Sequence, residues 1–193
     1  PAEAVNKLEV GTAEVAGASM TADEWMKTAE AKGSAVKDKA SLVPHVVIEE
    51  ETAVVVNAAN SITSLSQEQL QGIFSGRIQN WKEVGGTDVP ILIVWPRVAS
   101  GATTTFSKQI MIGSAIRKEI LDGASINDTV DAVASNPEAI SIANAEKIKT
   151  GAKKVAAPAL KRPLTLLTKG KPTPKVQKLL DFLQTAEARR AFR

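Results

Sequence analysis

Short apolar runs alternate with amphipathic segments along most of the chain. Five runs that are rich in β-branched residues and bounded by turn residues predict strands, at 42–50, 52–57, 91–95, 139–143 and 163–168, and a shorter one lies at 13–18. The segments between them place apolar residues three and four positions apart, which is typical of helices with one buried face. This alternation predicts an α/β fold built on a mainly parallel sheet.

Two helix starts have a complete capping-box signature. Thr21 and Glu24 have the spacing in which each side chain caps the other residue's backbone, and this predicts a helix over 22–31. Ser66 and Gln69 repeat the spacing. Both pairs are flanked by apolar residues at the positions of a hydrophobic staple. We therefore expect helices to begin at both places.

Other helices are predicted from single end signals. Gly11 and Gly76 are expected to end two helices, because glycine adopts the left-handed conformation that closes a helix. Asn127 is predicted to cap a short helix over 128–134, and Thr173, followed by a proline, begins a C-terminal helix. The apolar stripe of that last helix comprises Val176, Leu179, Leu180 and Leu183.

The residue inventory excludes several kinds of chemistry. The chain of 193 residues has no cysteine, which excludes disulfides, thiolate metal sites and cysteine nucleophiles. Its single histidine, His45, lies in an apolar run and is interpreted as a strand residue, so we expect neither a histidine-based metal site nor a cofactor. Glu49, Glu50 and Glu51 would point to alternate faces of a strand and form no catalytic dyad. The sequence therefore predicts a protein that is not an enzyme.

The charge is distributed unevenly although the net charge is only +3. Residues 145–193 contain 13 Lys and Arg against 3 Asp and Glu. A basic surface can attract nucleic acid, a membrane or small anions, but a solvated surface is the commoner explanation. No aromatic residues interleave with these lysines and the chain has no tyrosine, so the stacking platform of a single-strand binder is missing. We expect no nucleic-acid partner.

One turn has the composition of an anion site. Between the apolar run 91–95 and a helix expected from about Ala102 lies the sequence WPRVASGATTTF. Amide N–H groups at a helix start favour an anion, and Gly101 lets it approach the backbone closely. Ser100 and the threonines at 103 and 104 add hydroxyl donors, and Arg97 adds a charge-assisted pair. The spacing is not that of a nucleotide-binding P-loop, and simple helix capping stays the alternative explanation.

A long stretch of the sequence resembles the phosphate-binding proteins that serve ABC importers, the PstS-like type II periplasmic solute-binding proteins. The similarity runs through 65–86 (LSQEQLQGIFSGRIQNWKEVGG), 89–91 (VPI), Arg97 with Ser100-Gly101, 136–140 (NPEAI), 161–170 (KRPLTLLTKG) and the C-terminal helix. It covers nearly the whole chain. The resemblance implies an extracytoplasmic, non-enzymatic protein that captures a small oxyanion, phosphate first, and delivers it to an ABC permease in the membrane.

The resemblance also implies a domain organisation. The fold would consist of two α/β lobes joined by two crossing segments, at 54–57 and 164–168. Lobe I would be discontinuous, comprising 1–53 and 167–193, and lobe II would comprise 54–166. The two lobes would close on the oxyanion by a hinge motion.

The anion-binding residues that the resemblance implies are Arg97, Ser100, Gly101, Ala102, Thr103 and Ser19. The chain departs from the family at two of these contacts. Ala102 stands where the family has a threonine, so a hydroxyl is lost while the amide stays. Met20 follows Ser19 where the family has a charged residue, and in phosphate-specific members an aspartate there accepts the proton of hydrogen phosphate. Selectivity for phosphate therefore needs a test.

A third departure concerns the front of the chain. The family begins with a strand, a turn, a helix and a second strand, whereas this sequence is expected to enter near the helix at 2–10. Lobe I would then be incomplete, and an unpaired sheet edge would favour a homo-oligomer. The alternative function is a degenerate or truncated binding-protein-like module that acts in protein interaction or sensing without transport.

Overall fold

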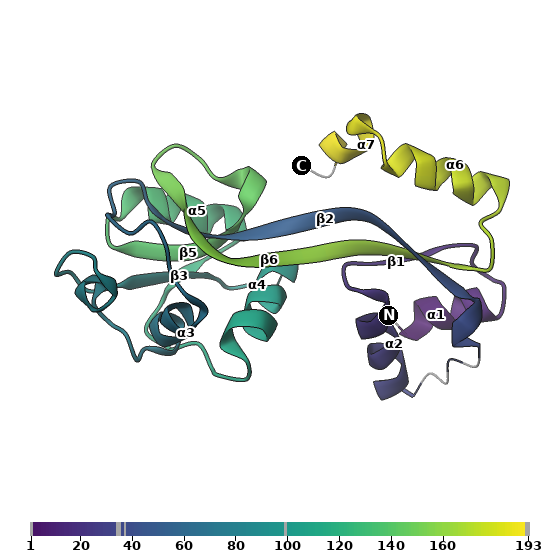
Figure 1. Ribbon diagram of the computed structural model, residues 1–193, viewed down its shortest axis with the longest axis horizontal. Coiled ribbons are helices and arrows are strands. Elements are labelled where there is room, and N and C mark those ends of the chain that lie inside the picture. Colours follow the sequence, from purple (N-terminus) through teal and green to yellow (C-terminus); the bar gives the residue numbers. More distant parts are fainter. Residues whose placement is uncertain (1, 34–35, 37, 99, 192–193) are drawn as a thin grey trace. The chain divides into compact units, whose positions relative to one another are not determined.

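The computed structural model describes residues 2–33, 36, 38–98 and 100–191 (Figure 1). The chain divides into two compact units. Unit 1 comprises Pro1–Glu50 and Arg162–Arg193, and unit 2 comprises Glu51–Lys161. The chain therefore passes from one unit to the other twice, once inside each of two long strands.

The two units contain helices and strands in alternation. The helices are α1 (Ala2–Glu9), α2 (Ala22–Ala31), α3 (Gln67–Ser75), α4 (Gly101–Phe106), α5 (Ile126–Ser135), α6 (Pro174–Leu183) and α7 (Ala186–Ala191). Short 3-10 helices are η1 (Lys39–Ser41), η2 (Trp81–Val84) and η4 (Ala145–Lys147), and η3 (Ser107–Met111) is a π-helix. The strands are β1 (Ala16–Ala18), β2 (Leu42–Asn57), β3 (Leu92–Pro96), β4 (Leu121–Gly123), β5 (Ala139–Asn144) and β6 (Ala152–Lys169).

The strands follow the order β1-β6-β2-β5-β3-β4, and their directions are mixed. β1 runs antiparallel to β6 and β2 antiparallel to β5, whereas β3 is parallel to both β4 and β5. The α/β class is confirmed, but the prediction of a mainly parallel sheet was wrong. Apolar alternation tells which side chains are buried and gives no information on strand direction.

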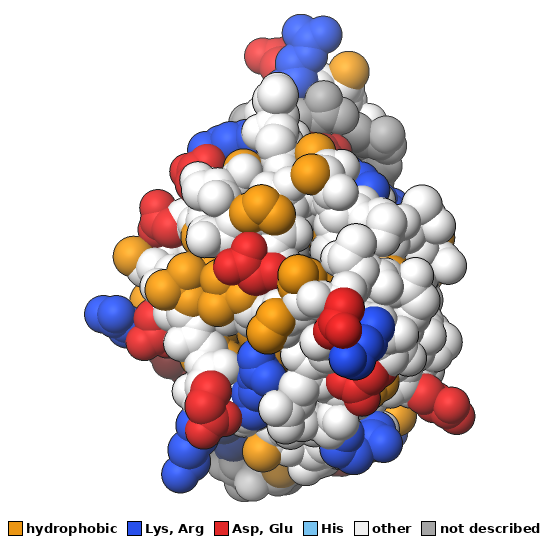
Figure 2. Space-filling model, turned by 90° about the vertical axis from the view of Figure 1, so that its left-hand side faces the viewer, with side chains coloured by type: hydrophobic (Ala, Val, Ile, Leu, Met, Phe, Trp, Pro, Cys, Tyr) orange, Lys and Arg blue, Asp and Glu red, His pale blue; other side chains and the backbone are white. Residues whose placement is uncertain are grey.

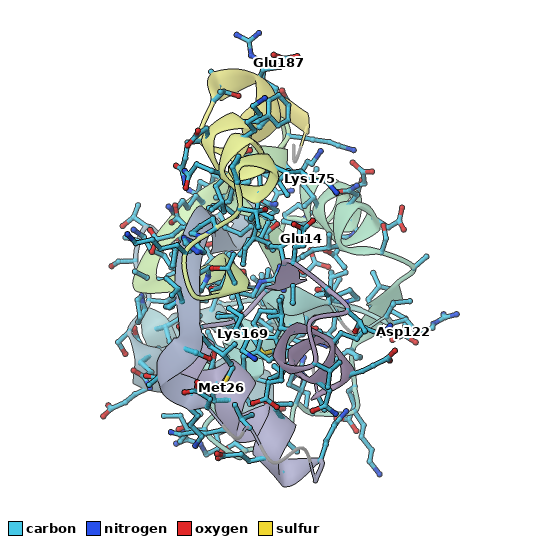
Figure 3. The ribbon with its side chains drawn as sticks, turned by 90° about the vertical axis from the view of Figure 1, so that its right-hand side faces the viewer. Glu14, Met26, Asp122, Lys169, Lys175 and Glu187 are labelled. Atoms are coloured by element: carbon cyan, nitrogen blue, oxygen red, sulfur yellow. The ribbon has the colours of Figure 1, made fainter. Side chains whose placement is uncertain are left out.

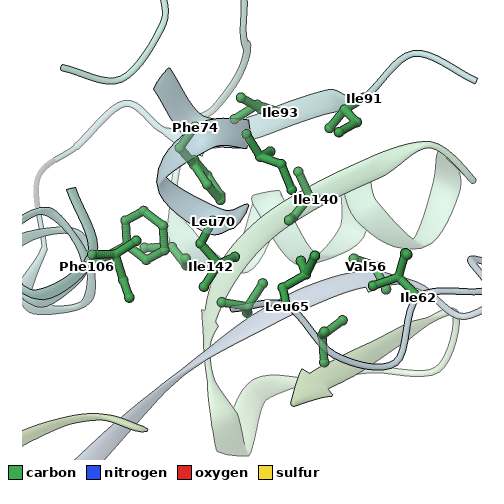
Figure 4. Packing of buried hydrophobic residues seen from close by; sticks show 14 of the residues in the cluster. Val56, Ile62, Leu65, Leu70, Phe74, Ile91, Ile93, Phe106, Ile140 and Ile142 are labelled. Carbon is green, nitrogen blue, oxygen red and sulfur yellow. The ribbon is translucent and has the colours of Figure 1, made fainter. Parts of the chain in front are cut away.

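The core of unit 2 fills both faces of its part of the sheet. On one face, alternate strand residues such as Val54, Val56 and Ile140 pack against α3 and α4 through Phe74 and Phe106 (Figure 4). On the opposite face, the intervening strand residues pack against α5, and this layer contains Ala53, Val55, Val94, Val130 and Val133. Because successive strand residues point to opposite faces, the run from Ala53 to Val56 contributes to both layers.

Unit 1 has the same two-sided arrangement around β1 and its parts of β6 and β2. On one face Leu167 packs with Val5 of α1 and Trp25 of α2. On the other, Val47 packs with Val176 and with further apolar residues of α6 and α7. His45 lies in β2 as expected, and its Nε2 is 3.0 Å from the Thr168 hydroxyl.

The strands β2 and β6 are longer than the sequence predicted. The runs 42–50 and 52–57 form one strand, and β6 begins at Ala152, eleven residues before the predicted start at 163. Charged residues interrupt the apolar pattern from which these strands were predicted, and the structure shows why such residues are tolerated within β2 and β6. In unit 1 Arg162 pairs with Glu50, and in unit 2 Lys154 pairs with Glu51.

Helix starts agree with the prediction where a capping box was present. Thr21 caps α2 and Ser66 caps α3, each through the reciprocal bonds expected, and Gly76 ends α3 with a φ of 84°. At α5 the prediction was wrong, because Ser125 is the capping residue and Asn127 lies inside the helix. Ser125 accepts from the Asp128 N–H at 3.3 Å, so the helix begins two residues earlier than predicted.

The C-terminal helix starts at Thr173 as predicted, but its apolar stripe is narrower. Val176, Leu180 and Leu183 are buried, whereas Leu179 is 40% exposed. A residue one position before Leu180 lies a quarter of a turn away from the buried stripe. The elements β4, η2 and α7 were not predicted.

Candidate functional site

Unit 2 contains a pocket of about 630 Å³ that is lined by Arg97, Thr103 and Thr104 of the turn predicted to bind an anion. It lies beside the ends of β3 and β4 and along α4 and η3. Its lining comprises Trp95, Pro96, Arg97, Thr103, Thr104, Ser107, Lys108, Gly113 and Asp122. The pocket is therefore bounded by the carboxyl end of a parallel strand pair and by one side of a helix, where α/β proteins commonly bind ligands.

The position of Arg97 is fixed by the pairing of β3 with β4. In this parallel pair Trp95 lies opposite Asp122 and Pro96 opposite Gly123. The Arg97 N–H then donates to the Gly123 carbonyl at 2.8 Å, which continues the ladder by one bond. The Arg97 backbone is therefore fixed at the edge of the strand pair, while its side chain extends into solvent.

The Arg97 guanidinium faces one carboxylate of the pocket. Its Nη2 lies 3.8 Å from Asp122 Oδ2, and the two side chains are 72% and 52% exposed. An ion pair of this length and exposure contributes little to stability, so it does not hold the guanidinium firmly at Asp122. Arg97 can turn toward a stronger oxyanion without a large cost.

Trp95 gives the pocket a rigid apolar wall. Its ring contacts Phe74 and Phe106 edge-on, with centroid separations of 5.6 and 5.5 Å. Phe74 and Phe106 are fully buried. This aromatic cluster anchors the end of β3 against α3 and α4 and so fixes where Arg97 emerges.

Ser100 begins α4 with a reciprocal cap. Its Oγ accepts from the Thr103 N–H at 3.3 Å, and its own N–H donates to Thr103 Oγ1 at 2.7 Å. The hydroxyls of Thr103 and Thr104 both donate to the Ser100 carbonyl, at 2.8 and 2.9 Å. The two threonine hydroxyl protons that were expected to serve a ligand are therefore directed at the helix start itself.

The amides of Gly101 and Ala102 form the remaining donor pair. Among the described residues, neither N–H group has a hydrogen-bond acceptor. The Ser100 Oγ acts as an acceptor in the cap, so its hydroxyl proton remains available for donation to a ligand. Two amides and one hydroxyl are thus available at the start of α4, whose first residue follows Arg97 by four positions.

Ser19 belongs to unit 1 and the other predicted residues belong to unit 2. It is exposed and lies between the end of β1 and Thr21, the residue that caps α2. Arg97 and Thr103 line the pocket, and Ser100, Gly101 and Ala102 lie in the same unit at the start of α4. The role of Ser19 rests on the resemblance and stays a prediction.

The helical segment that carries the pocket ends in an unusual backbone conformation. α4 continues into the π-helix η3, and Ile112 follows with a φ of 46°. Left-handed geometry is rare for a β-branched residue and stores strain. Gln71 of α3 donates to the Met111 carbonyl at 3.0 Å, which holds this end in place. Gly113, the next residue, reaches the pocket.

The charges of the pocket were only partly predicted. Lys108 and Asp122 line it together with Arg97, so the lining carries two cations and one carboxylate. Asp122 lies in the three-residue strand β4, which has no apolar pattern to reveal it. Lys108 was detectable in principle, since it follows Thr104 by four residues on the same helix face. Figure 2 shows charges of both signs interspersed over one face of the molecule rather than a continuous basic field.

Several residues of the basic C-terminal third are paired with acidic residues of their own unit. In unit 1, Lys175 lies 3.4 Å from Glu14 (Figure 3) and Arg162 pairs with Glu50. In unit 2, Lys149 pairs with Asp131 at 2.8 Å and Lys154 with Glu51. The sequence interpretation of these residues as merely solvated was therefore incomplete.

Two further features bear on function. In the part of the chain that the structure describes, no group of three or more His, Cys, Asp or Glu residues could hold a metal ion. No helix among those residues has the length and apolar character needed to cross a membrane.

Unit 1 has a second pocket, of about 440 Å³, whose lining includes Leu42, Leu167 and charged residues of α2.

Comparison with known proteins identifies the class and then the family. The fold is that of the type II periplasmic binding proteins. The chain belongs to the PBP superfamily, whose domain pattern matches residues 2–187. An ABC-type phosphate transport receptor from Vibrio cholerae is similar in structure, with a TM-score of 0.74, 24% identity, and coverage of 96% of this chain and 80% of that one. PstS from Borrelia burgdorferi has a TM-score of 0.72 at 18% identity, covering 95% of this chain and 78% of that one.

A curated relative matches part of the sequence. The phosphate-binding protein PstS of Bacillus subtilis (strain 168) is 35% identical over 103 residues, which are 53% of this chain and 34% of that protein. The match therefore spans about a third of the relative's length. The names of the Bacillus subtilis and Vibrio cholerae proteins describe a binding protein and a transport receptor, which agrees with the prediction that the chain is not an enzyme.

Proposed function

We propose that the protein is an extracytoplasmic solute-binding receptor that captures a small oxyanion, with phosphate as the first choice, and presents it to an ABC permease. The family supports the receptor class, and the relatives named for phosphate support the choice of ligand. The two units would act as lobes that close on the ligand. Ligand capture by such closure is a hinge motion.

One observation carries the proposal. In unit 2 the Arg97 side chain is exposed at a pocket, and the helix that follows begins with the amides of Gly101 and Ala102, for which the described residues provide no acceptor. Unpaired amides at a helix start and a guanidinium are the donors that oxyanions prefer. The Ser100 hydroxyl adds a further donor beside them.

The binding chemistry follows from these groups. Arg97 would form a bidentate, charge-assisted pair with two oxygens of the anion, and the amides would bind a third. Thr103 would contribute through the cap that sets the direction of the Gly101 and Ala102 amides, since its own hydroxyl is bonded to Ser100. Ser19 remains in the proposal as a hydroxyl donor because of the resemblance alone.

A thermal-shift screen tests this proposal. Phosphate, arsenate, sulfate and molybdate are each added to the native protein, because a ligand that binds only the folded state stabilises it by RT ln(1 + [L]/Kd). We expect phosphate to raise the melting temperature of the native protein and of Lys118→Ala, a control at an exposed lysine of unit 2. Arg97→Ala should remove most of the shift.

Two results would contradict the proposal. An unchanged phosphate shift in Arg97→Ala would remove this residue from the site. The absence of a shift with every oxyanion would instead favour the interaction or sensing module that was the alternative from the sequence.

A further inference from the structure

An oxyanion held by Arg97 would lie beside a carboxylate. Asp122 Oδ2 is 3.8 Å from Arg97 Nη2, and both side chains line the pocket of unit 2. Among the described residues of this lining Asp122 is the one acid, and the second cation, Lys108, belongs to the helical wall. A bare oxyanion on the guanidinium would therefore be repelled by a like charge nearby. At this end of the pocket a cation and an anion lie side by side.

The strand register fixes this arrangement. Asp122 lies opposite Trp95 in the parallel pair of β3 and β4, so the two side chains project from the same face of the sheet. Arg97 follows Trp95 by two residues, which places it on the same side of the chain. Its N–H donates to the Gly123 carbonyl at 2.8 Å, so the ladder continues up to this residue. The three side chains are therefore neighbours through the pairing of two strands.

The two charged side chains remain accessible to a ligand. They are 72% and 52% exposed, and an ion pair at such exposure contributes little to stability. A ligand with both an anionic and a cationic group can replace this pair, with its anion on Arg97 and its cation on Asp122. Each protein charge then keeps an opposite charge beside it. A bare oxyanion satisfies Arg97 but leaves Asp122 next to negative charge.

The rest of the lining suits the body of such a ligand. Trp95 and Pro96 supply apolar surface, and an aromatic ring attracts a cation that lies over its face. The volume of about 630 Å³ falls within the range of about 300–1,000 Å³ that is common for sites of small organic molecules. We infer that this site takes a phosphomonoester that bears an ammonium group, with its phosphoryl group on Arg97 and its ammonium on Asp122. The inference rests on the proposed function and narrows its ligand class.

Three probes separate the contributions of the two groups. Orthophosphate reports the Arg97 subsite alone, ethyl phosphate adds the carbon chain, and phosphoethanolamine adds an ammonium to the same chain. Dissociation constants are measured by isothermal titration calorimetry at low ionic strength, because salt screens exposed charges. The proteins are the native chain, Asp122→Asn and the control Glu68→Gln. Glu68 is an exposed acid of unit 2 outside the pocket lining, so both substitutions change the net charge equally.

We expect phosphoethanolamine to bind the native protein and Glu68→Gln about threefold to fivefold more tightly than ethyl phosphate does, the gain of one exposed ion pair. In Asp122→Asn this preference should vanish, and the affinity for orthophosphate should rise because the neighbouring negative charge is gone.

Three results would overturn the inference. The first is equal affinity of the native protein for the two esters, and the second is a preference that survives in Asp122→Asn. The third is a weaker affinity of Asp122→Asn for orthophosphate, because Asp122 would then assist the phosphoryl group itself. Failure of the proposed function has a different signature, since then neither orthophosphate nor either ester binds.

Discussion

At the scale of single residues, the structure shows where a side chain is required by geometry and where it is tolerated at a cost. Gly76 and Gly113 have φ values of 84°, which glycine adopts without strain. Ile112 has a φ of 46° although it is β-branched and 65% exposed. Because this side chain is mostly exposed, burial of apolar surface does not offset the backbone strain at this position.

Relief of that strain should stabilise the protein. We expect Ile112→Asn to raise the free energy of unfolding by about 1 kcal/mol, because asparagine tolerates left-handed geometry and little apolar contact is lost. Urea denaturation gives the value. Val98→Asn is the control, at a residue that is also 65% exposed but has no positive φ. Equal effects of the two substitutions would show that strain is not the cause.

Glu83 should make stability depend on pH. The N–H groups of Gln79 and Asn80 donate to its carboxylate at 2.9 and 2.8 Å and hold the pKa of Glu83 below its ordinary value of 4.5. A group whose pKa is lowered on folding stabilises the folded state above its unfolded pKa, and this stabilisation is lost as the pH falls through the folded pKa.

We therefore expect Glu83→Gln to lower the urea midpoint at pH 7, and the difference from the native protein to shrink as the pH falls below about 4.5. Urea titrations at pH 7, 4 and 3 measure it. A difference that stays constant from pH 7 to pH 3 would show that ionisation of this carboxyl plays no part.

At the scale of elements, capping chemistry decided which helix predictions succeeded. α2 and α3 have complete capping boxes, and their starts were predicted to the residue. At α5 two candidate caps lie close together, Ser125 and Asn127, and the sequence favoured the wrong one. A single polar residue is a weak signal because Ser, Asn and Asp are all good caps.

The corrected cap can be tested directly. We expect Ser125→Ala to lower the free energy of unfolding by about 1 kcal/mol, since it removes the acceptor for the Asp128 N–H. Asn127→Ala is the matched control and should change stability by less than about 0.5 kcal/mol. Chemical denaturation of both variants provides the comparison. The reverse order of effects would restore Asn127 as the cap.

Sequence patterns predicted the helical and apolar parts of the fold better than its sheet. The apolar residues Val54 to Val56 and Ile140 identified buried strands, but strand order and direction depend on pairing between distant segments. The first half of β6 was missed because its lysines hide the apolar alternation. Lys154 fits the strand because Glu51 of β2 pairs with it.

At the scale of the whole molecule, the proposed site consists of a few groups, of which only some were visible in the sequence. The turn at Arg97 and Ser100 was visible in the sequence because glycine, hydroxyl residues and arginine follow a strand there. Lys108 and Asp122 were not identified, although the spacing of Lys108 from Thr104 offered a signal, whereas Asp122 reaches the pocket only through the pairing of β3 with β4. Composition predicted a basic C-terminal third but not that several of its charges are paired within their own units.

The central claim is that Arg97 and the start of α4 hold a phosphate ion. Isothermal titration calorimetry with phosphate, on the native protein and on Arg97→Ala, tests it most directly. We predict a saturable isotherm with one site for the native protein and an affinity about tenfold or more weaker for the variant, because a hydrogen bond to a charged group is worth about 1.5–3 kcal/mol. Equal affinities, or no binding of phosphate to the native protein, would contradict the account.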